Sequence, residues 1–391
     1  DYDAVSLYPS AMARLWTVEG RPNVISDSHL NLEFLSKQAA YIVEIKITAV
    51  HKHYPFPLIV QKINGLNVNC DEITEPITMV VDNIMLEDLI NFQQIEFEFI
   101  KGYYWDGERD TRIQDEIKKI FQKRVEYKRQ KNPLQQLYKL IMNSCYGKTI
   151  EKPVEKDIKY IRGFEDKEKY IRKNYNKIVE ITEIRDSDIY GVKEIVPIDD
   201  HFNFSLLGIQ VLSMSKRIMN EVMCLAYDIG CKIYYQDTDS MHIVKEDLEK
   251  LEKAFEDKYH RPLKGTNLGQ FHTDFCSFDG REDVQHAVRS IFLMKKMYID
   301  ELRMSDNTYS FMFRGKGLTT KSILHLAKKK YGNNLMSLYN DLYEGFTLTF
   351  DLTKGQPCFR MDKDLSVVNI KDFKRKIKTD YEEGKDDEYF K

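Results

Sequence analysis

The feature that most constrains the fold is a pair of aspartates, Asp237 and Asp239, placed two residues apart between two short apolar runs. Residues 231–235 and 241–244 favour β-strands, so the sequence predicts a hairpin with both carboxylates at its tip. Asp3 lies at the end of another expected strand. Three carboxylates at neighbouring strand ends suit two hard cations, which prefer oxygen ligands and leave positions open for phosphate oxygens. A lone Asp-x-Asp is usually a turn, so the flanking sequence has to decide.

The hydrophobic pattern indicates a mixture of strands and helices. Residues 40–50 alternate apolar and polar side chains, which predicts a half-buried strand with residues 56–63 as its partner. Asp82 can cap a helix, and Pro133 breaks a helical pattern into an antiparallel pair. The expected helices cover residues 85–92, 112–146, 206–229, 246–259 and 319–331, further strands cover 78–81, 95–105, 287–299 and 308–313, and short strands and loops cover 152–198.

Charge is distributed unevenly along the chain. The net charge of −3 over 391 residues excludes a uniformly basic nucleic-acid binder. Residues 112–152 nevertheless carry eleven basic and four acidic side chains, and residues 286–330 carry ten and three. These two basic segments are typical of surfaces that bind a polyanion, although solvated helix faces would give the same counts. The cysteines show no Cys-x-x-Cys spacing, and no apolar run reaches eighteen residues, so neither a zinc site nor a membrane span is expected.

Four segments together resemble the motifs of family B DNA polymerases. The segment around Asp3 is similar to motif A and reads DYDAVSLYPSAM. Motif B, Lys-x-x-x-Asn-Ser-x-Tyr-Gly, is similar to residues 139–147, KLIMNSCYG. Residues 235–240, YQDTDS, match motif C, and residues 296–298, KMY, resemble the later Lys-x-Tyr motif. The resemblance implies an α+β right-hand polymerase with an antiparallel palm sheet, helical fingers, a small thumb and strand-rich insertions.

The long spacing between motifs A and B resembles the protein-primed branch of this family, which is found in phages, adenoviruses and linear organellar plasmids. That branch implies a terminal protein as primer, whereas an ordinary primer remains the alternative. The resemblance divides the chain into a palm segment over residues 1–20, a first terminal-protein-like insertion over 21–109, fingers with motif B over 110–147, a second insertion with palm over 148–202, palm with motif C and Lys-x-Tyr over 203–300, and thumb and tail over 301–391.

The resemblance also implies a role for individual residues. Asp3 and Asp239 are expected to bridge two Mg²⁺ ions, with Mn²⁺ as an alternative, while Asp237 is expected to be a weaker ligand. The backbone carbonyl of Ala4 is expected to complete one coordination sphere, and Lys139 to act in catalysis. The residues implied in nucleotide binding are Ser6, Leu7, Tyr8, Arg124, Lys128, Lys139, Asn143 and Tyr146, with Tyr8 as a steric gate against ribose. Those implied in primer and template binding are Lys296, Tyr298 and Lys316.

The expected function is template-directed DNA synthesis from dNTPs on a DNA template and primer, in the cytoplasm or in the mitochondrion, nucleus or infected cell that holds the replicating element. No secretion and no membrane partner are expected. Two alternatives remain: a catalytically silent polymerase-like scaffold that binds DNA, and a reverse transcriptase or RNA polymerase with a similar palm. The retained aspartates argue against the scaffold. The upstream exonuclease domain that is usual in this family has no counterpart in the sequence, which is expected to be the polymerisation half of a longer protein.

Overall fold

The central sheet brings the segment around Asp3 next to the segment around Asp239. The computed structural model describes residues 1–63, 65–70, 72–152, 154–197, 203–352, 359–361, 368–370 and 374–379. The central sheet has the antiparallel order β13-β14-β1-β15, formed by Ile233–Asp237, Ser240–Ile243, Tyr2–Ala4 and Phe271–Thr273. Asp3 pairs with Ser240 in this sheet, so two segments more than two hundred residues apart become neighbours.

Three helices cover the central sheet and form the largest core. They are α1 (Leu7–Met12), α7 (Ser205–Asp228) and α8 (Lys245–Tyr259). The apolar face of α7 is buried over most of its length, and Phe255 of α8 and Phe271 of β15 are fully buried beside it. This apolar packing holds the ends of β1, β13 and β14 in fixed relative positions, because dense interiors resist displacement.

The expected hairpin forms, but its strands begin and end at other residues than predicted. β13 extends through Asp237 itself and β14 begins at Ser240, whereas the sequence predicted strands at 231–235 and 241–244. Thr238 occupies the turn with a φ of 60°, in the left-handed region. The shift arises because the polar residues at the tip continue the strand pairing, and hydrophobic periodicity alone does not detect such pairing.

An outer sheet is formed by residues near the N-terminus, in the order β3-β8-β4-β7. Its strands are β3 (Asn23–Val24), β4 (Ala40–Val50), β7 (Ile77–Asp82) and β8 (Ile95–Trp105), and β4 coincides with the expected strand. The prediction that residues 56–63 pair with β4 is wrong, because β5 (Val60–Ile63) pairs with β6 (Leu66–Asn69) instead. The two long strands β7 and β8 already occupy both edges of β4, and an alternating pattern does not specify its partner.

Short elements connect the outer sheet to the rest of the chain. Asp82 caps α3 (Asn83–Asp88) by accepting a hydrogen bond from the Met85 N–H at 2.8 Å, as the sequence predicted. The helix then widens into a π-helical turn at Leu89–Gln93. The remaining elements are β2 (Thr17–Val18), paired with β9 (Arg109–Asp110), a 3₁₀ turn at Asp27–His29, and α2 (Leu32–Leu35).

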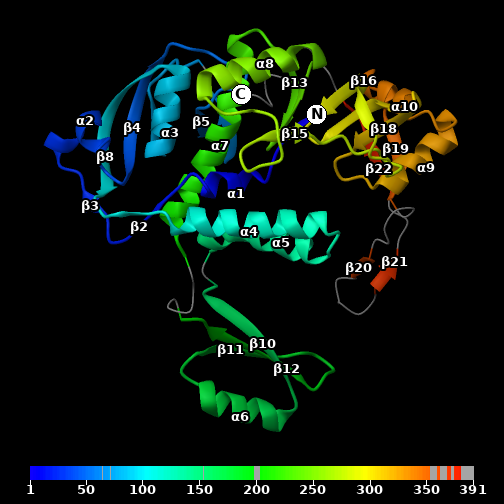
Figure 1. Cartoon of the computed structure of the whole chain (residues 1–391). Coiled ribbons are helices and arrows are strands. Elements are labelled where there is room, and N and C mark those ends of the chain that lie inside the picture. The colour runs from blue at the N-terminus through cyan, green and yellow to red at the C-terminus, as the bar shows by residue number, and fades with distance from the viewer. Residues whose placement is uncertain are drawn as a thin grey trace.

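Two antiparallel helices, α4 (Arg112–Arg129) and α5 (Leu134–Thr149), follow the outer sheet and run below the central sheet in Figure 1. Pro133 separates them, as expected. Below them, residues 156–195 form a distal sheet in the order β10-β12-β11, from Lys156–Arg162, Ile189–Ile195 and Ile178–Glu183. Helix α6 (Phe164–Asn174) lies beside this sheet and was not expected, because its sequence is mostly charged and has no apolar face that becomes buried.

The C-terminal part contains a three-stranded sheet, β16-β17-β18, made of Val284–Met294, Met297–Met304 and Tyr309–Arg314. The expected strand over residues 287–299 is therefore a hairpin that turns at Lys295 and Lys296, because Lys296 takes a left-handed φ of 61°. Helices α9 (Thr320–Tyr331) and α10 (Leu335–Tyr343) pack on this sheet, next to β19 (Leu348–Asp351) and β22 (Lys374–Ile377). A separate strand pair joins β20 (Phe359–Met361) to β21 (Val368–Ile370). Within the expected thumb and tail over residues 301–391, residues 353–358, 362–367, 371–373 and 380–391 lie outside the described residues.

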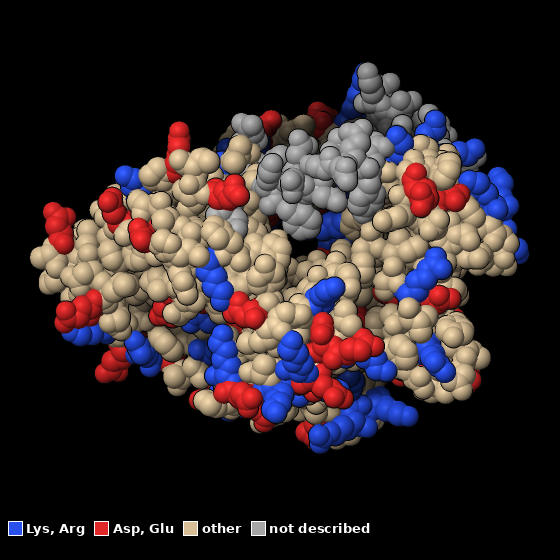
Figure 2. Space-filling model, turned by 90° about the horizontal axis from the view of Figure 1, so that it is seen from above, with Lys and Arg blue, Asp and Glu red and all other residues tan. Residues whose placement is uncertain are grey.

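The charge segregation expected from the sequence is visible on the surface. On the face shown in Figure 2, Lys and Arg side chains gather at the right-hand edge, on the side where Figure 1 places α9 and α10. The last turn of α9 alone carries Lys328, Lys329 and Lys330. None of the described helices combines the length and the apolarity that crossing a bilayer requires.

Candidate active site

A cavity of about 900 Å³ lies between the central sheet and the α4–α5 pair. It collects most of the residues that the sequence assigned to catalysis and nucleotide binding. Residues 3–9 form one wall, and α4 and α5 form another. The predicted residues that line it are Asp3, Ala4, Ser6, Leu7, Tyr8, Arg124, Lys128, Lys139, Asn143 and Asp239.

Two carboxylates of the cavity, those of Asp3 and Asp239, are held close together by backbone pairing. The Ala4 N–H donates to the Asp239 carbonyl at 2.8 Å, which ties the end of β1 to the turn of the hairpin. Burial, reinforced by repulsion from Asp239 and Asp274, raises the pKa of Asp3 to about 7, whereas Lys139 opposes this shift. Burial followed by the Asp237 and Asp274 charges also raises the pKa of Asp239. Such a pair has a high electrostatic cost unless a cation or a proton neutralises it.

The chemistry of this pair fits a divalent cation. Carboxylate oxygens are the ligands that Mg²⁺ prefers, and Mg²⁺ keeps several positions for water and phosphate oxygens rather than requiring an all-protein cage. Among the described residues, no group of three His, Cys, Asp or Glu side chains forms a complete metal site. Asp3 and Asp239 therefore suit an ion whose coordination is completed by a phosphate-bearing ligand.

Asp237 has a different environment from its neighbour. Its carboxylate Oδ1 lies 3.6 Å from the Lys296 ammonium and accepts a hydrogen bond from the Thr238 hydroxyl at 3.2 Å. It does not line the 900 Å³ cavity. The structure thus brings Asp3 and Asp239 together and leaves Asp237 paired with a lysine.

The opposite wall of the cavity is cationic. Arg124, Lys128 and Lys139 all line it, which is the convergence that the sequence predicted. Arg124 donates to the Ser6 hydroxyl at 3.0 Å, and Ser6 has a left-handed φ of 51° where α1 begins. Burial lowers the pKa of Arg124. Cations on one side and carboxylates on the other make the cavity suitable for a polyphosphate with its metal ion.

Two tyrosines stack beside the cavity. The rings of Tyr8 and Tyr146 lie 4.4 Å apart between centroids at an angle of 11°. Tyr8 lines the cavity, and Asn143 lies one turn before Tyr146 on α5. The stacked pair provides a flat apolar surface next to the carboxylates, which is suitable for a sugar and a base.

The three residues assigned to primer and template binding lie outside the cavity. Lys296 forms the turn between β16 and β17, and its N–H donates to the Tyr235 hydroxyl at 2.7 Å. Tyr298 is buried beneath that turn, while Lys316 is exposed between Gly315 and Gly317. Only Lys296 contacts a motif aspartate, through its ion pair with Asp237.

Sequence reasoning missed several residues of the cavity, namely Arg129, Thr266, His272 and Asp274. Asp274 directly follows β15, which pairs with β1 and brings its end beside Asp3. A polar residue at the end of a short strand was the available signal. That signal was too weak without the knowledge that β15 pairs with β1.

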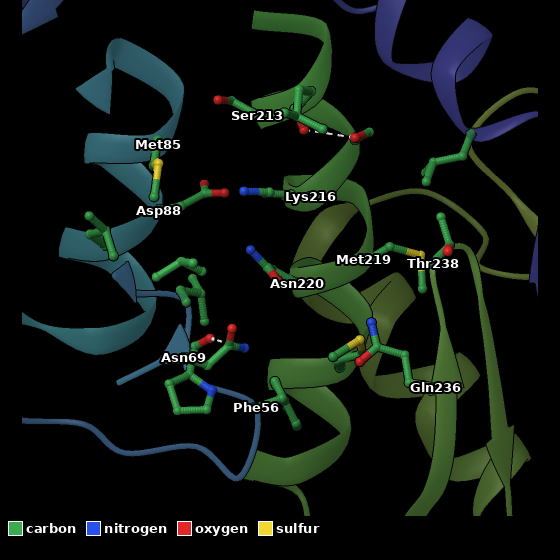
Figure 3. Close-up of a pocket in the computed structure, with 18 of the residues that line it drawn as sticks. Phe56, Asn69, Met85, Asp88, Ser213, Lys216, Met219, Asn220, Gln236 and Thr238 are labelled. Carbon is green, nitrogen blue, oxygen red and sulfur yellow. Dashed lines mark hydrogen bonds between the residues drawn. The ribbon is translucent and has the colours of Figure 1, made fainter. Parts of the chain in front are cut away.

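A second cavity of about 350 Å³ shares Leu7 and Tyr8 with the first. It lies between α3 and α7, and Figure 3 shows Lys216 of α7 extending toward Asp88 of α3. Gln236 and Thr238 line its hairpin side. Thr238 of the turn thus lines this cavity, whereas the next residue, Asp239, lines the 900 Å³ cavity.

The sequence matches a known family. Residues 1–198 match the family described as DNA polymerase type B, organellar and viral. A DNA polymerase of Kluyveromyces lactis is 25% identical over 284 residues, which are 71% of this chain and 27% of that protein. The chain therefore spans only a minor part of the length of that relative.

The fold matches solved polymerase structures. A ternary complex of phi29 DNA polymerase with primer-template DNA and incoming nucleotide is similar with a TM-score of 0.57 and 16% identity, over 97% of this chain and 57% of that chain. A binary complex of phi29 DNA polymerase with primer-template DNA gives a TM-score of 0.58 and 16% identity, and the match covers 96% of this chain and 57% of that chain. The expected α+β right-hand polymerase fold is confirmed, and so is the resemblance to family B DNA polymerases.

Proposed function

The chain belongs to the organellar and viral type B DNA polymerases, and we propose that it extends a DNA primer on a DNA template by transferring deoxynucleotides from dNTPs. The observation that carries this proposal is the single cavity that holds Asp3 and Asp239 on one side and Arg124, Lys128 and Lys139 on the other. The primer 3′-hydroxyl attacks the α-phosphate, and pyrophosphate leaves. Such reactions depend on positioning and charge neutralisation more than on covalent chemistry.

The carboxylates hold the metal ions. Asp3 and Asp239 would bind Mg²⁺, or Mn²⁺ in its place, the Ala4 carbonyl would complete one coordination sphere, and Asp237 would be a weaker ligand. When bound, two such ions neutralise the phosphate charge and favour the deprotonated hydroxyl nucleophile. Burial, and then repulsion from Asp239 and Asp274, raise the pKa of Asp3 to about 7; a bound cation would displace the proton and relieve this repulsion.

The cations of α4 and α5 hold the triphosphate. Arg124 is held in place by its hydrogen bond to Ser6, and Lys139 lies close enough to Asp3 to lower its pKa. Lys128 lies one turn after Arg124 on the same helix face. Because the leaving pyrophosphate gains negative charge, Lys139 stabilises it, and the backbone at Leu7 approaches the sugar and phosphate.

Tyr8 selects the sugar. Its ring is fixed by stacking on Tyr146 at 4.4 Å, so it cannot easily move away from a ribose 2′-hydroxyl. Asn143 and Tyr146 face the nascent base pair from α5. A Tyr8→Val variant should incorporate ribonucleotides at least about tenfold more readily relative to deoxynucleotides. Unchanged sugar discrimination would remove this role.

The primer and template bind along the C-terminal part of the cleft. Lys296 and Tyr298 hold the primer terminus, and Lys316 contacts phosphate from its exposed turn. In this proposal residues 1–20 and 203–300 are the palm, 110–147 the fingers and 301–391 the thumb with its tail. Residues 21–109 and 148–202 are the two insertions, the latter with part of the palm.

A terminal protein is the proposed primer, with an ordinary primer as the alternative. A Mg²⁺-dependent transfer of one deoxynucleotide to a Ser, Thr or Tyr hydroxyl of a candidate terminal protein would support it. The proposed setting is replication of a virus, phage or linear plasmid, in the compartment that holds that element.

Primer extension tests the whole proposal. We expect the chain to extend a DNA primer on a DNA template with dNTPs and Mg²⁺, and to do so poorly with rNTPs. Binding to primer–template without any extension would favour the silent scaffold. Extension with rNTPs, or extension restricted to an RNA template, would favour an RNA polymerase or a reverse transcriptase.

A further inference from the structure

A buried histidine lies where the hairpin of the central sheet meets the C-terminal sheet. His242 of β14 is 6% exposed, and its Nε2 is 3.2 Å from Oδ2 of Asp300, which is fully buried on β17. Asp300 also accepts a hydrogen bond from the Ser290 hydroxyl at 2.6 Å. On the other side of the ring, Nδ1 lies 3.8 Å from Oδ1 of Asp1. These last two atoms are buried and have no hydrogen-bond partner.

Aromatic rings enclose the imidazole. Their centroids lie between 5.0 and 6.3 Å from that of the His242 ring. Such an enclosure excludes water and strengthens the attraction between the imidazole and its carboxylates. It also makes the loss of any partner costly, because the remaining polar groups stay buried. The four rings are Tyr235, Phe275, Phe292 and Tyr298.

The cluster joins three segments, of which two carry an aspartate of the cavity and the third carries Tyr298, which is proposed to hold the primer terminus. Asp1 precedes Asp3 by two residues, and His242 follows Asp239 by three. Since Tyr2 pairs with Met241, the same register places Asp1 opposite His242. Asp300 follows Tyr298 by two residues on β17.

The same contact region holds the Lys296 turn. The Tyr235 hydroxyl accepts the Lys296 N–H at 2.7 Å, while the Tyr235 ring packs on His242. Lys296 has a left-handed φ of 61°, which is unfavourable for a lysine and persists only when its surroundings hold it. Displacement of the hairpin from β17 would therefore move both the turn and its ion pair with Asp237.

We propose that His242 is a positioning residue: through its hydrogen bond with Asp300 and its packing inside the aromatic enclosure next to Asp1, it fixes the aspartate hairpin relative to the Lys296 turn. The inference rests on the proposed function, since its role is to align the metal-binding carboxylates with the primer terminus. His242 itself does not line the nucleotide cavity. Substitution of His242 should therefore impair the catalytic step and primer binding, and should leave the binding of the dNTP unchanged.

The test compares kcat, the primer–template Kd and the KM for dNTP in single-nucleotide extension by the wild-type chain and by His242→Ala. We expect kcat to fall about 10²-fold, as for a misplacement of about 1 Å, and primer–template binding to weaken. The KM for dNTP should stay within about twofold, because the cations of α4 and α5 are untouched. His242→Gln should recover part of kcat, because its amide can still donate to Asp300.

The matched control is Ser310→Ala. Ser310 lies buried in the C-terminal sheet that also holds Asp300, 2.6 Å from the Ser277 hydroxyl, and it pairs with Leu302 and not with Asp300. This control should lose stability and keep kcat. If His242→Ala does not fold, Ser290→Ala, which removes one donor to Asp300, should lower kcat by a smaller factor.

The outcomes separate the two proposals. No extension by the wild-type chain would contradict the proposed function itself. Wild-type extension together with an unchanged kcat in His242→Ala, or in Ser290→Ala where His242→Ala does not fold, would overturn only the positioning role. An equal loss of kcat in Ser310→Ala would also overturn it, because general destabilisation would then explain the effect.

Discussion

The central sheet and the distal sheet are both antiparallel sheets with a helix beside them, yet they are stabilised in different ways. The central sheet packs on α7, whose apolar face is buried along most of its length. In the distal sheet, α6 has no buried residue, and Tyr160 and Tyr175 are 68% and 75% exposed. The region that carries the carboxylates therefore has a large apolar core, and the distal region does not.

Polar contacts replace the missing core in the distal sheet. The Tyr170 hydroxyl of α6 donates to Glu194 of β12 at 2.7 Å, and the Lys159 ammonium of β10 lies 2.7 Å from the same carboxylate. These two contacts lower the pKa of Glu194. Beneath them Val192 is fully buried. The comparison indicates that precise chemistry requires the dense apolar packing of the central sheet, whereas the distal sheet can open locally without disturbing it.

The largest expected effect tests whether the carboxylates of the central sheet bind the metal ions for primer extension. Asp239→Asn should lower the rate of primer extension by about 10³-fold or more, which is about 4 kcal/mol of transition-state stabilisation. The fold should survive, because the substitution removes a repulsion next to Asp3 rather than a packing contact. Single-turnover extension measures the rate, and circular dichroism verifies the fold. A variant with normal extension would contradict the assignment of Asp239 as a metal ligand.

The next effect compares the two regions in stability. Phe255→Ala removes a fully buried ring from the core around α7 and should cost about 3–5 kcal/mol. Ile181→Ala in the distal sheet is the matched change, and because Ile181 is 45% exposed it should cost less than about 1 kcal/mol. Chemical denaturation of both variants measures the difference. Similar losses would show that the distal sheet belongs to the same cooperative core.

The free energy of unfolding should depend on pH through Asp3 of the central sheet. The pKa of Asp3 rises in the folded state from 3.8 to about 7, so between these values the folded chain binds more protons than the unfolded chain. In the absence of metal, stability should therefore fall as the pH rises through this window, by about 1–2 kcal/mol after solvent screening is allowed for. Asp3→Asn should reduce this dependence and leave the smaller contribution of Asp239, whose pKa is also raised by burial, and thermal unfolding at several pH values can measure the difference. For the same reason, Mg²⁺ should bind more tightly as the pH rises through 7.

The smallest effect concerns the polar contacts of the distal sheet. Tyr170→Phe removes the hydroxyl that donates to Glu194, and should cost about 1 kcal/mol within that region. Hydrogen exchange should quicken in β10, β11 and β12 and stay unchanged in β13 and β14. A change in the central sheet would show that the two regions are coupled.

Much of the candidate site was predictable because its residues lie in short contiguous motifs. Asp3, Ser6 and Tyr8 lie in one segment, and Lys139, Asn143 and Tyr146 lie at helical spacing in another, so a resemblance to known motifs identifies them one by one. The cavity collects nearly all of the residues assigned to nucleotide binding. Asp274 and His242 were missed because each acquires its environment from a strand pairing that no local pattern encodes.

The sequence by itself led to the proposed class of chemistry and to the carboxylates and cations proposed for it, and it determined most helices and long strands, since these depend on local periodicity and motif spacing. The tertiary structure decided which aspartate of the pair faces the nucleotide cavity and which faces Lys296. It also decided that β4 pairs with β7 and β8, and that α6 forms beside a sheet. These outcomes depend on contacts between residues far apart in the chain, whose free energy comes from packing and burial and leaves no periodic signal in any one segment.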